Sequence, residues 1–371
     1  MRVLIFSLEF PPMIGGAGSY AYNLSIGLNN EKIKVDILTS NRGEDLKSKN
    51  IDNELSKNGI KVFRKKWNNK IWVFEWKYIL KNHLKKNTYD NIFFANSTAI
   101  MIGSKLDKRI LGNFTCTLHG SERYTFLQRK QSLFTKIKYN RLSVLSFLRA
   151  SKIVICVSKD LFEDVKRLNL NLPLQIIPLG ISESFIRKNQ VGFAGDKEQV
   201  LNIVSTSRLV PMKGIDFVLK SLTSLELNFH YFIVGEGSDY GRLNNLVQEL
   251  NLVDKVTFLG ALSQDKLISL YEEMSMFILC SRFKETFGLV YLEAMGSGLP
   301  VIGRNKGAIK DIILDNYNGA LLESESSNEL IEKIYKVLEN FNSYSENSFQ
   351  KAKEYSLKNM IINHIKYIDI L

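Results

Sequence analysis

SRFKETFGLVYLEAMGSGLPVI, residues 281–302, is the stretch that decides how we interpret this chain. The apolar run 276–279 precedes it, and residues 301–302 follow Pro300, so the spacing predicts the order strand, turn, helix, strand. The glycines at positions 296 and 298 mark the expected end of the helix. This order is typical of α/β domains in which helices connect parallel strands.

Two carboxylates lie on either side of the predicted helix start. Glu285 is in the loop ahead of the helix, Gly288 is near its start, and Glu293 is more than one turn inside it. This arrangement leaves the N–H groups of Phe287, Gly288 and Leu289 at the positive helix terminus, which favours a phosphate. The alternative is an ordinary αβ element with two solvated glutamates, and only the rest of the chain distinguishes the two.

The composition indicates a folded protein with two cores. The chain has 371 residues, of which 45% are hydrophobic and 24% charged. The three cysteines, at positions 116, 156 and 280, each lie in an apolar run and indicate buried thiols in a reducing compartment, without a zinc site. No window has 18 uninterrupted apolar residues, so no membrane-spanning helix is expected.

The positive charge is concentrated in the first half of the chain. Residues 1–180 carry 30 Lys and Arg against 14 Asp and Glu, whereas residues 181–371 carry 20 against 24. Residues 61–86 mix nine basic residues with aromatic ones, and residues 123–152 contain eight basic residues and no acid. Such segments suit an anionic membrane, an anionic acceptor or nucleic acid, and solvated helix faces are the simpler alternative.

Apolar runs typical of buried parallel strands recur along the chain, with helical patterns between them. They are residues 3–6, 33–38, 91–95, 114–118 and 153–157, then 201–205, 229–234, 256–259, 276–279 and 300–303. This alternation predicts two doubly wound α/β domains in tandem. We expect residues 1–180 to form the first domain, completed by a C-terminal helix at 355–371, and residues 181–354 to form the second.

A glycine-rich loop, FPPMIGGAGSY, follows the first predicted strand. Its glycines at positions 15, 16 and 18 allow close backbone approach to a ligand. A helix is expected to continue over residues 20–28, so the arrangement can present N–H groups to an anion. The loop lacks the GK[ST] of a Walker motif and the GxGxxG spacing of a dinucleotide site. Asp36 is expected inside the second strand rather than at its tip, which argues further against a dinucleotide oxidoreductase.

Three other polar residues follow predicted strands. His119 comes after the apolar run FTCTL, and a histidine at the carboxyl end of a parallel strand faces the edge where α/β proteins bind ligands, although a lone histidine is often structural. Arg208 and Lys213 follow another strand, around a turn centred on a proline. A guanidinium and an ammonium group there would neutralise a diphosphate without a metal.

Taken together, these motifs resemble the retaining glycosyltransferases of family 4, which have the GT-B architecture of two Rossmann-like, doubly wound parallel-sheet domains facing across a cleft. The resemblance covers nearly the whole chain. It rests on GGAG at 15–18, HGSE at 119–122, VSKDL at 157–161, IPLGI at 177–181, SRLVPMKG at 207–214, VGEG at 234–237 and ETFGLVYLEAMGSGLPVI from Glu285.

The resemblance implies a hexosyltransferase that uses a UDP-sugar or GDP-sugar donor and needs no metal or other cofactor. Arg208 and Lys213 would stabilise the departing diphosphate, with the Gly16 amide and the N–H groups of Phe287, Gly288 and Leu289. Glu293 would bind the ribose hydroxyls, Glu285 the hydroxyls of the transferred sugar, and His119 would position that sugar. Transfer with retention and without a covalent enzyme intermediate is expected.

The expected acceptor is a glycan or a polyprenyl-linked glycan of a bacterial surface polysaccharide pathway. A cytoplasmic protein that binds an anionic membrane peripherally, on its inner face, would fit the basic and aromatic segments. The alternatives are a nucleotide-sugar epimerase on the same fold and, in a different class, a basic nucleic-acid-binding module. The latter would leave Arg208, Lys213 and the two glutamates unexplained, so no nucleic acid is expected as a partner.

Overall fold

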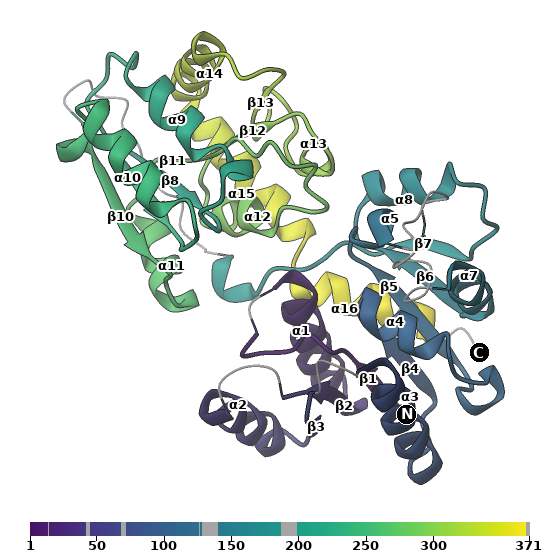
Figure 1. Cartoon of the computed structure of the whole chain (residues 1–371). Coiled ribbons are helices and arrows are strands. Elements are labelled where there is room, and N and C mark those ends of the chain that lie inside the picture. Colours follow the sequence, from purple (N-terminus) through teal and green to yellow (C-terminus); the bar gives the residue numbers. More distant parts are fainter. Residues whose placement is uncertain are drawn as a thin grey trace. The chain divides into compact units, whose positions relative to one another are not determined.

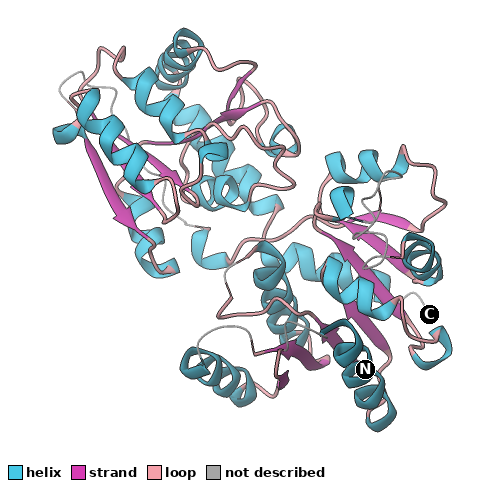
Figure 2. Ribbon diagram, in the orientation of Figure 1, coloured by secondary structure: helices cyan, strands magenta, loops and turns pink. Residues whose placement is uncertain are grey.

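The chain folds into two compact units, which we describe separately (Figure 1). The computed structural model describes residues 1–13, 15–41, 45–67, 72–125, 127, 140–186 and 199–368. Unit 1 contains Met1–Leu179 and Leu357–Leu371, and unit 2 contains Gly180–Ser356. Each unit is a parallel sheet with helices packed around it (Figure 2).

The sheet of unit 1 has seven parallel strands. In spatial order they are β3 (Lys61–Lys65), β2 (Lys34–Ser40), β1 (Arg2–Phe6), β4 (Asn91–Phe94), β5 (Phe114–Leu118), β6 (Ile153–Cys156) and β7 (Leu174–Ile176). The order reverses direction between β1 and β4, which are hydrogen-bonded neighbours. Every side chain of β4 and β5 is buried, as expected for the centre of a sheet covered on both faces.

The helices of unit 1 connect these strands, and one comes from the other end of the chain. They are α1 (Gly16–Asn30), α2 (Asp45–Lys57), α3 (Trp72–Lys86), α4 (Ser97–Gly103), α5 (Glu122–Thr125), α7 (Arg141–Ala150), α8 (Lys159–Lys166) and α16 (Leu357–Ile368). The C-terminal helix α16 packs against α1, so the last part of the chain belongs to the same core as the first strand (Figure 1).

The sheet of unit 2 has six parallel strands and the same reversal. In spatial order they are β10 (Val256–Gly260), β9 (Phe229–Val234), β8 (Leu201–Thr206), β11 (Met276–Leu279), β12 (Val301–Arg304) and β13 (Gly319–Leu322). The described helices are α9 (Ile215–Leu222), α10 (Tyr240–Glu249), α11 (Gln264–Glu272), α12 (Leu289–Gly296), α13 (Ile309–Ile312), α14 (Ser327–Glu339) and α15 (Phe341–Glu354). Helix α9 packs with α10 and α14, and α12 packs with α15.

The prediction of two doubly wound parallel sheets is confirmed, and all ten predicted strands are present. Three further strands, β3, β7 and β13, were not predicted, and each lies at the edge of its sheet. Edge strands are covered on fewer sides, so their sequences need not be apolar or long. The helical pattern expected at the C-terminus is a pair of helices, α15 and α16, interrupted at Tyr355 and Ser356.

Two predictions about individual residue types are also confirmed. Asp36 lies inside β2, where its buried carboxylate pairs with the Arg2 guanidinium at 2.6 Å and accepts a hydrogen bond from the Tyr89 hydroxyl at 2.7 Å. This carboxylate is therefore part of the core and not a ribose-binding acid. The three cysteines, Cys116, Cys156 and Cys280, are buried free thiols.

The basic segments divide between described and undescribed residues. Residues 61–86 form β3 and α3, except that 68–71 lie outside the described residues. Within residues 123–152, positions 126 and 128–139 also lie outside them, as does 187–198 of the predicted domain boundary. Among the helices that the structure describes, none is both long enough and apolar enough to cross a membrane.

Candidate active site

The loops of unit 2 that carry the predicted site residues leave two adjacent strands. Strands β8 and β11 lie next to each other, and the order of strands reverses between them. In open α/β sheets, ligands bind beyond the carboxyl ends of the strands at this reversal, because the two loops diverge to opposite faces. The loop after β8 contains Arg208 and Lys213, and the loop after β11 contains Glu285. The fold thus brings together groups that are about 75 residues apart in the sequence.

Arg208 is an exposed side chain on a loop whose backbone is held in place. The N–H group of Leu209 donates to the Glu236 carbonyl at 2.8 Å, and the N–H group of Asp239 donates to the Leu209 carbonyl at 3.0 Å. The guanidinium itself forms no hydrogen bond or ion pair with any residue that the structure describes. An unpaired guanidinium on a fixed loop is a suitable group for binding an oxyanion.

The glycine loop VGEG after β9 packs against the loop that carries Arg208. A Cβ atom added to Gly235 would lie 1.8 Å from the Ser207 carbonyl oxygen, and one added to Gly237 would lie 2.1 Å from the Leu209 carbonyl oxygen. Both glycines are therefore needed for close packing of two backbones. The sequence motif, which also matches many nucleotide-binding loops, here serves to place Arg208.

Lys213 and Glu285 form an ion pair. The Lys213 Nζ atom donates to Glu285 Oε1 at 2.6 Å, and the side chains are 18% and 15% exposed. The backbone on each side is fixed: a Cβ on Gly214 would lie 2.1 Å from the Cys280 carbonyl oxygen, and the Ala308 N–H donates to the Glu285 carbonyl at 2.9 Å. The sequence analysis expected separate roles for these two residues and did not predict their contact.

Helix α12 begins directly after a glycine in the left-handed conformation. Gly288 is its N-cap with φ of 99°, no described side chain caps the helix, and no acid lies in its first turn. Since the helix starts at Leu289, the N–H groups at its positive end are those of Gly288, Leu289 and Val290. Phe287, which the sequence analysis included, precedes the cap, and its buried ring packs against Tyr355.

Glu293 lies in the second turn of α12 and is half-buried. Its carboxyl group forms no hydrogen bond with another described residue, and burial raises its pKa to about 7. The neighbouring Tyr271 hydroxyl donates to Thr206 Oγ1 at 3.1 Å rather than to Glu293. A carboxyl group without a protein partner has its full capacity to accept hydrogen bonds from hydroxyl groups of a ligand.

In unit 1, the corresponding reversal between β1 and β4 places the glycine-rich loop and α1 at the carboxyl ends of the strands. Gly16 is the first residue of α1, whose first turn contains no acid. A Cβ atom added to Gly16 would meet no atom within 4 Å. Among the described atoms, none therefore blocks the side-chain direction at Gly16. The contact of its N–H group with a diphosphate stays a prediction.

His119 follows β5, next to the same edge. Its Nε2–H group donates to the Ala95 carbonyl at 2.9 Å, because a carbonyl oxygen can only accept. Burial lowers the pKa of the imidazole to about 4, so the ring is neutral at physiological pH. Nδ1 then carries a lone pair, and no described residue donates a hydrogen bond to it.

Glu122 is a residue of this region whose importance the sequence analysis missed. Its side chain is fully buried, and Oε2 accepts hydrogen bonds from the N–H groups of His119 at 3.0 Å and Gly120 at 2.7 Å. Burial raises its pKa to about 7. Glu122 thus fixes the backbone that carries His119. The sequence feature that could have indicated this role is the acid at the end of HGSE, a short loop that follows a buried strand.

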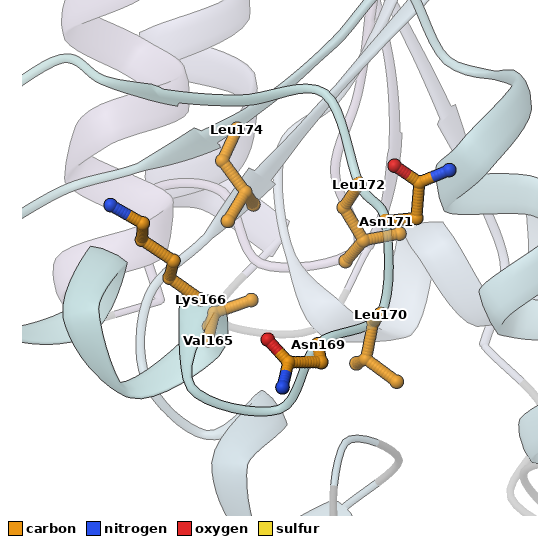
Figure 3. A pocket seen from close by; sticks show the side chains of 7 residues that line it. All are labelled: Val165, Lys166, Asn169, Leu170, Asn171, Leu172 and Leu174. Atoms are coloured by element: carbon orange, nitrogen blue, oxygen red, sulfur yellow. The ribbon is translucent and has the colours of Figure 1, made fainter.

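Figure 3 shows a pocket that lies elsewhere in unit 1. It has a volume of about 200 Å³ and is lined by Val165, Lys166, residues 169–172 and Leu174. Leu174 is the first residue of β7, so the pocket lies at the amino end of that strand, whereas the candidate site residues follow carboxyl ends. Within the described part of the chain, no group of three or more His, Cys, Asp or Glu residues is arranged to hold a metal ion.

Two family models match consecutive parts of the chain. The model described as Glycosyltransferase Family 4 matches residues 14–185, and the model described as Glycosyl transferases group 1 matches residues 187–355. An uncharacterized glycosyltransferase of Methanocaldococcus jannaschii is 27% identical over 367 residues, which are 98% of this chain and 96% of that protein. The alpha-monoglucosyldiacylglycerol synthase of Acholeplasma laidlawii is 23% identical over 361 residues, 92% of this chain and 89% of its own.

Solved structures share the fold at lower identity. The Anabaena protein HepE, crystallised in complex with UDP, has a TM-score of 0.79 to this chain with 17% identity, and all of both chains is covered. The same protein has also been crystallised with UDP-glucose. The chain therefore belongs to the group 1 and family 4 glycosyltransferases and has their GT-B fold of two Rossmann-like domains.

Proposed function

We propose that this glycosyltransferase transfers a sugar from a nucleoside diphosphate sugar to a hydroxyl group of a glycan or lipid-linked acceptor in surface-glycan synthesis. One observation carries the proposal. The loops after the adjacent strands β8 and β11 contain the Arg208 guanidinium, the Lys213 ammonium and the start of α12. Among the described residues, none pairs with the Arg208 guanidinium and no side chain caps α12. The two cations and the helix start are three sources of positive charge or N–H donors, the chemistry that a diphosphate requires. The UDP complexes of HepE support the same class of donor.

The contact between Lys213 and Glu285 fits the junction between diphosphate and sugar. In a nucleotide sugar, the anomeric carbon is bonded to an oxygen of the terminal phosphate. An ammonium group that binds this phosphate and a carboxylate that binds sugar hydroxyls must then be neighbours, and here they are 2.6 Å apart. In this proposal Glu293 binds the ribose hydroxyls. The roles expected for Gly16 and His119 stay predictions.

The proposed reaction retains the configuration of the anomeric carbon. The bond from this carbon to the phosphate oxygen breaks, the acceptor oxygen bonds to the same face, and the acceptor proton moves to the released diphosphate. Stabilisation of the departing diphosphate by Arg208 and Lys213 supplies the main rate effect. Glu285 is not a nucleophile in this scheme, since its carboxylate is engaged by Lys213.

Product analysis with UDP-sugar and GDP-sugar donors and a lipid-linked acceptor tests the proposal. We expect a product whose anomeric proton signal shows the same configuration as the donor, with no metal added. A covalent glycosyl adduct on Glu285, detected by mass spectrometry of peptides, would contradict the retention scheme. Formation of an epimeric donor without acceptor would instead indicate the epimerase alternative.

Nucleotide affinity should depend on pH through Glu293. In the free protein this carboxyl has a pKa of about 7, and hydroxyl donors of a ribose favour its ionised form. Affinity for a nucleoside diphosphate should therefore rise several-fold from about pH 5.5 to about pH 8, since binding releases a proton. The measurement is calorimetric titration of the wild type and Glu293→Gln across this range.

The ratio of the two affinities removes the effect of phosphate ionisation, which both proteins share. A ratio that is constant with pH would show that Glu293 does not contact the nucleotide. Without nucleotide, the same group has the opposite effect on stability. Its folded pKa lies above the ordinary value of 4.5, so the free energy of unfolding should fall as the pH rises from about 4.5 to about 7.

Helix α3 provides the described part of the proposed membrane contact. Phe74 and Tyr78 are 77% and 67% exposed, and Lys77 lies on the same face, at helical spacing between them. Burial, and to a lesser extent the positive charge of Lys77, lowers the pKa of Lys105. Exposed aromatic rings beside clustered lysines suit the surface of an anionic bilayer.

A vesicle co-sedimentation assay tests this contact. We expect the protein to bind vesicles that contain phosphatidylglycerol at low salt, and binding to weaken as salt is added. The double variant Phe74→Ala, Tyr78→Ala should reduce the bound fraction several-fold, whereas Tyr317→Ala, at an exposed tyrosine of unit 2, should not. A wild type that stays in the supernatant with these vesicles at low salt would exclude the contact.

A further inference from the structure

The hydroxyl group of Tyr20 connects three distant parts of unit 1. Tyr20 lies on α1 and is 3% exposed. Its hydroxyl oxygen is 2.9 Å from Thr117 Oγ1 and 2.8 Å from His364 Nε2. Thr117 belongs to β5, two residues before His119, and His364 belongs to the C-terminal helix α16.

The direction of these hydrogen bonds follows from the last residue of the series. His364 Nδ1 lies 2.8 Å from the Met360 carbonyl oxygen, which only accepts, so Nδ1 carries the proton. Nε2 therefore accepts from the Tyr20 hydroxyl, and Tyr20 in turn accepts from Thr117. Burial lowers the pKa of His364 to about 4, so this arrangement persists at physiological pH. Every hydroxyl and ring nitrogen of the series has a partner, as buried polar groups require.

The ring of Tyr20 also contacts His119. The two ring centres are 5.0 Å apart, and the planes meet at 67°, an edge-to-face arrangement. The imidazole of His119 thus has two contacts: a hydrogen bond from Nε2 to the Ala95 carbonyl, and an edge-to-face contact with the ring of Tyr20. Its backbone N–H is held by Glu122. Tyr20 and Glu122 are two titratable groups that contact His119 or its backbone.

Helix α16 packs closely against α1. A Cβ atom added to Gly27 of α1 would lie 2.2 Å from Cγ1 of Ile361, so the Ile361 side chain occupies the space that the glycine leaves. Ile361 and His364 are three residues apart and lie on the same side of α16. The close packing therefore holds His364 against Tyr20.

We propose that Tyr20 is a positioning residue for His119, and that the C-terminal helix α16 holds Tyr20 through His364. This inference rests on the function proposed above for His119 in sugar transfer. Helix α16 would then influence the reaction through His364 and Tyr20, although it lies more than 200 residues from His119 in the sequence. The contacts of its ring and of Nε2 would orient the imidazole of His119, and among the described residues Nδ1 has no partner.

Steady-state kinetics of Tyr20→Leu and Tyr20→Phe, each alone and combined with His119→Ala, tests the inference. Tyr20→Leu should lower kcat by about tenfold or more while the donor KM changes by less than about twofold. Tyr20→Phe keeps the ring and should have a smaller effect. If Tyr20 acts through His119, both effects should disappear in the His119→Ala background.

Tyr89→Phe is the matched control. The Tyr89 hydroxyl is also bonded to a histidine and a second polar group in unit 1, His83 and Asp36, each at 2.7 Å, but it precedes the amino end of β4. Its removal should leave kcat within about twofold of the wild type. Equal losses of kcat in Tyr20→Leu with and without His119 present would overturn the inference.

Nuclear magnetic resonance provides a readout that needs no activity. The imidazole signals of His119 should titrate with a pKa of about 4 in the wild type and move toward the ordinary value of 6.5 in Tyr20→Leu, which exposes the ring. If Tyr20→Leu does not fold, Thr117→Val removes one hydroxyl with similar shape and should give a smaller shift in the same direction. An unchanged titration would overturn the inference, whereas a wild type without transferase activity would contradict only the proposed function.

Discussion

Replacing Arg208 with alanine should lower kcat for sugar transfer by about 10²-fold to 10³-fold, the range found when one group that stabilises developing charge is removed. The guanidinium is exposed and unpaired among the described residues, on a loop held by backbone hydrogen bonds to the Glu236 and Leu209 carbonyls. In the proposed reaction, the guanidinium would act most strongly when the diphosphate leaves and the charge of the diphosphate increases. The loss should therefore appear in kcat more than in the donor KM.

Two further variants make this prediction specific. Arg208→Lys keeps the charge but not the forked geometry and should give an intermediate loss. Arg242→Ala removes another half-exposed guanidinium of unit 2, one that already pairs with Asp239 at 2.6 Å, and should change kcat by less than about twofold. The melting temperature of Arg208→Ala should stay close to that of the wild type. An unchanged kcat in a folded Arg208→Ala would mean that the diphosphate binds elsewhere.

Replacing Gly235 with alanine should lower the free energy of unfolding of unit 2 by about 3 kcal/mol or more. The new Cβ atom would lie 1.8 Å from the Ser207 carbonyl oxygen, and the backbone at this position has φ of 128°, which alanine rarely adopts. Because the clash is with backbone atoms, no side-chain rotation can relieve it. In a unit of this size, such a loss lowers the melting temperature by roughly 6–12 °C.

Gly241→Ala is the control for this variant. Gly241 lies in α10 of the same unit, and a Cβ atom there would meet no atom within 4 Å. Alanine should stabilise the helix by up to about 1 kcal/mol. Thermal unfolding of both variants measures the difference. Since Ser207 precedes Arg208, Gly235→Ala should also weaken nucleotide binding. Equal melting temperatures for the two variants would show that the VGEG loop does not pack on this backbone.

The parallel strands at the centres of both sheets could be predicted from the sequence because they are buried on both faces. Strand β11 (MFIL) is a continuous apolar run, and β4 (NIFF) is one after its first residue, with turn signals beside both. The edge strand β3, KVFRK, carries three charged residues, and β7 has only three residues. Neither has a pattern that distinguishes it from a loop, because an edge strand can leave part of its surface in water.

The site was predictable where it depends on local sequence and unpredictable where it depends on packing. The helical pattern and the glycine predict where three residues lie: Glu285 before α12, Gly288 at its start and Glu293 inside it. The ion pair between Lys213 and Glu285 forms because β8 and β11 are neighbours in the sheet. The order of strands in a sheet cannot be predicted from a local sequence pattern.

The glycines of the VGEG loop have a role that their sequence motif did not predict. Their sequence is typical of a ligand loop, but their lack of side chains is required by the backbones of Ser207 and Leu209. The same residue type thus has a structural role that indirectly places a binding group. Glu122 shows the reverse, since an acid that looked like an ordinary loop residue is fully buried and fixes the backbone of His119.

The most direct test of the proposed nucleotide-sugar site is nucleotide binding to the wild-type protein. It is measured as the shift in melting temperature with UDP, GDP, ADP and NAD, each at millimolar concentration and without added metal. A ligand that binds only the folded state at about 100 times its Kd stabilises it by about 2.7 kcal/mol. We predict that one nucleoside diphosphate raises the melting temperature, and that Arg208→Ala and Glu293→Gln each reduce the shift. Stabilisation by NAD alone, or by none of the four ligands, would contradict the assignment of a nucleotide-sugar site to the loops after β8 and β11.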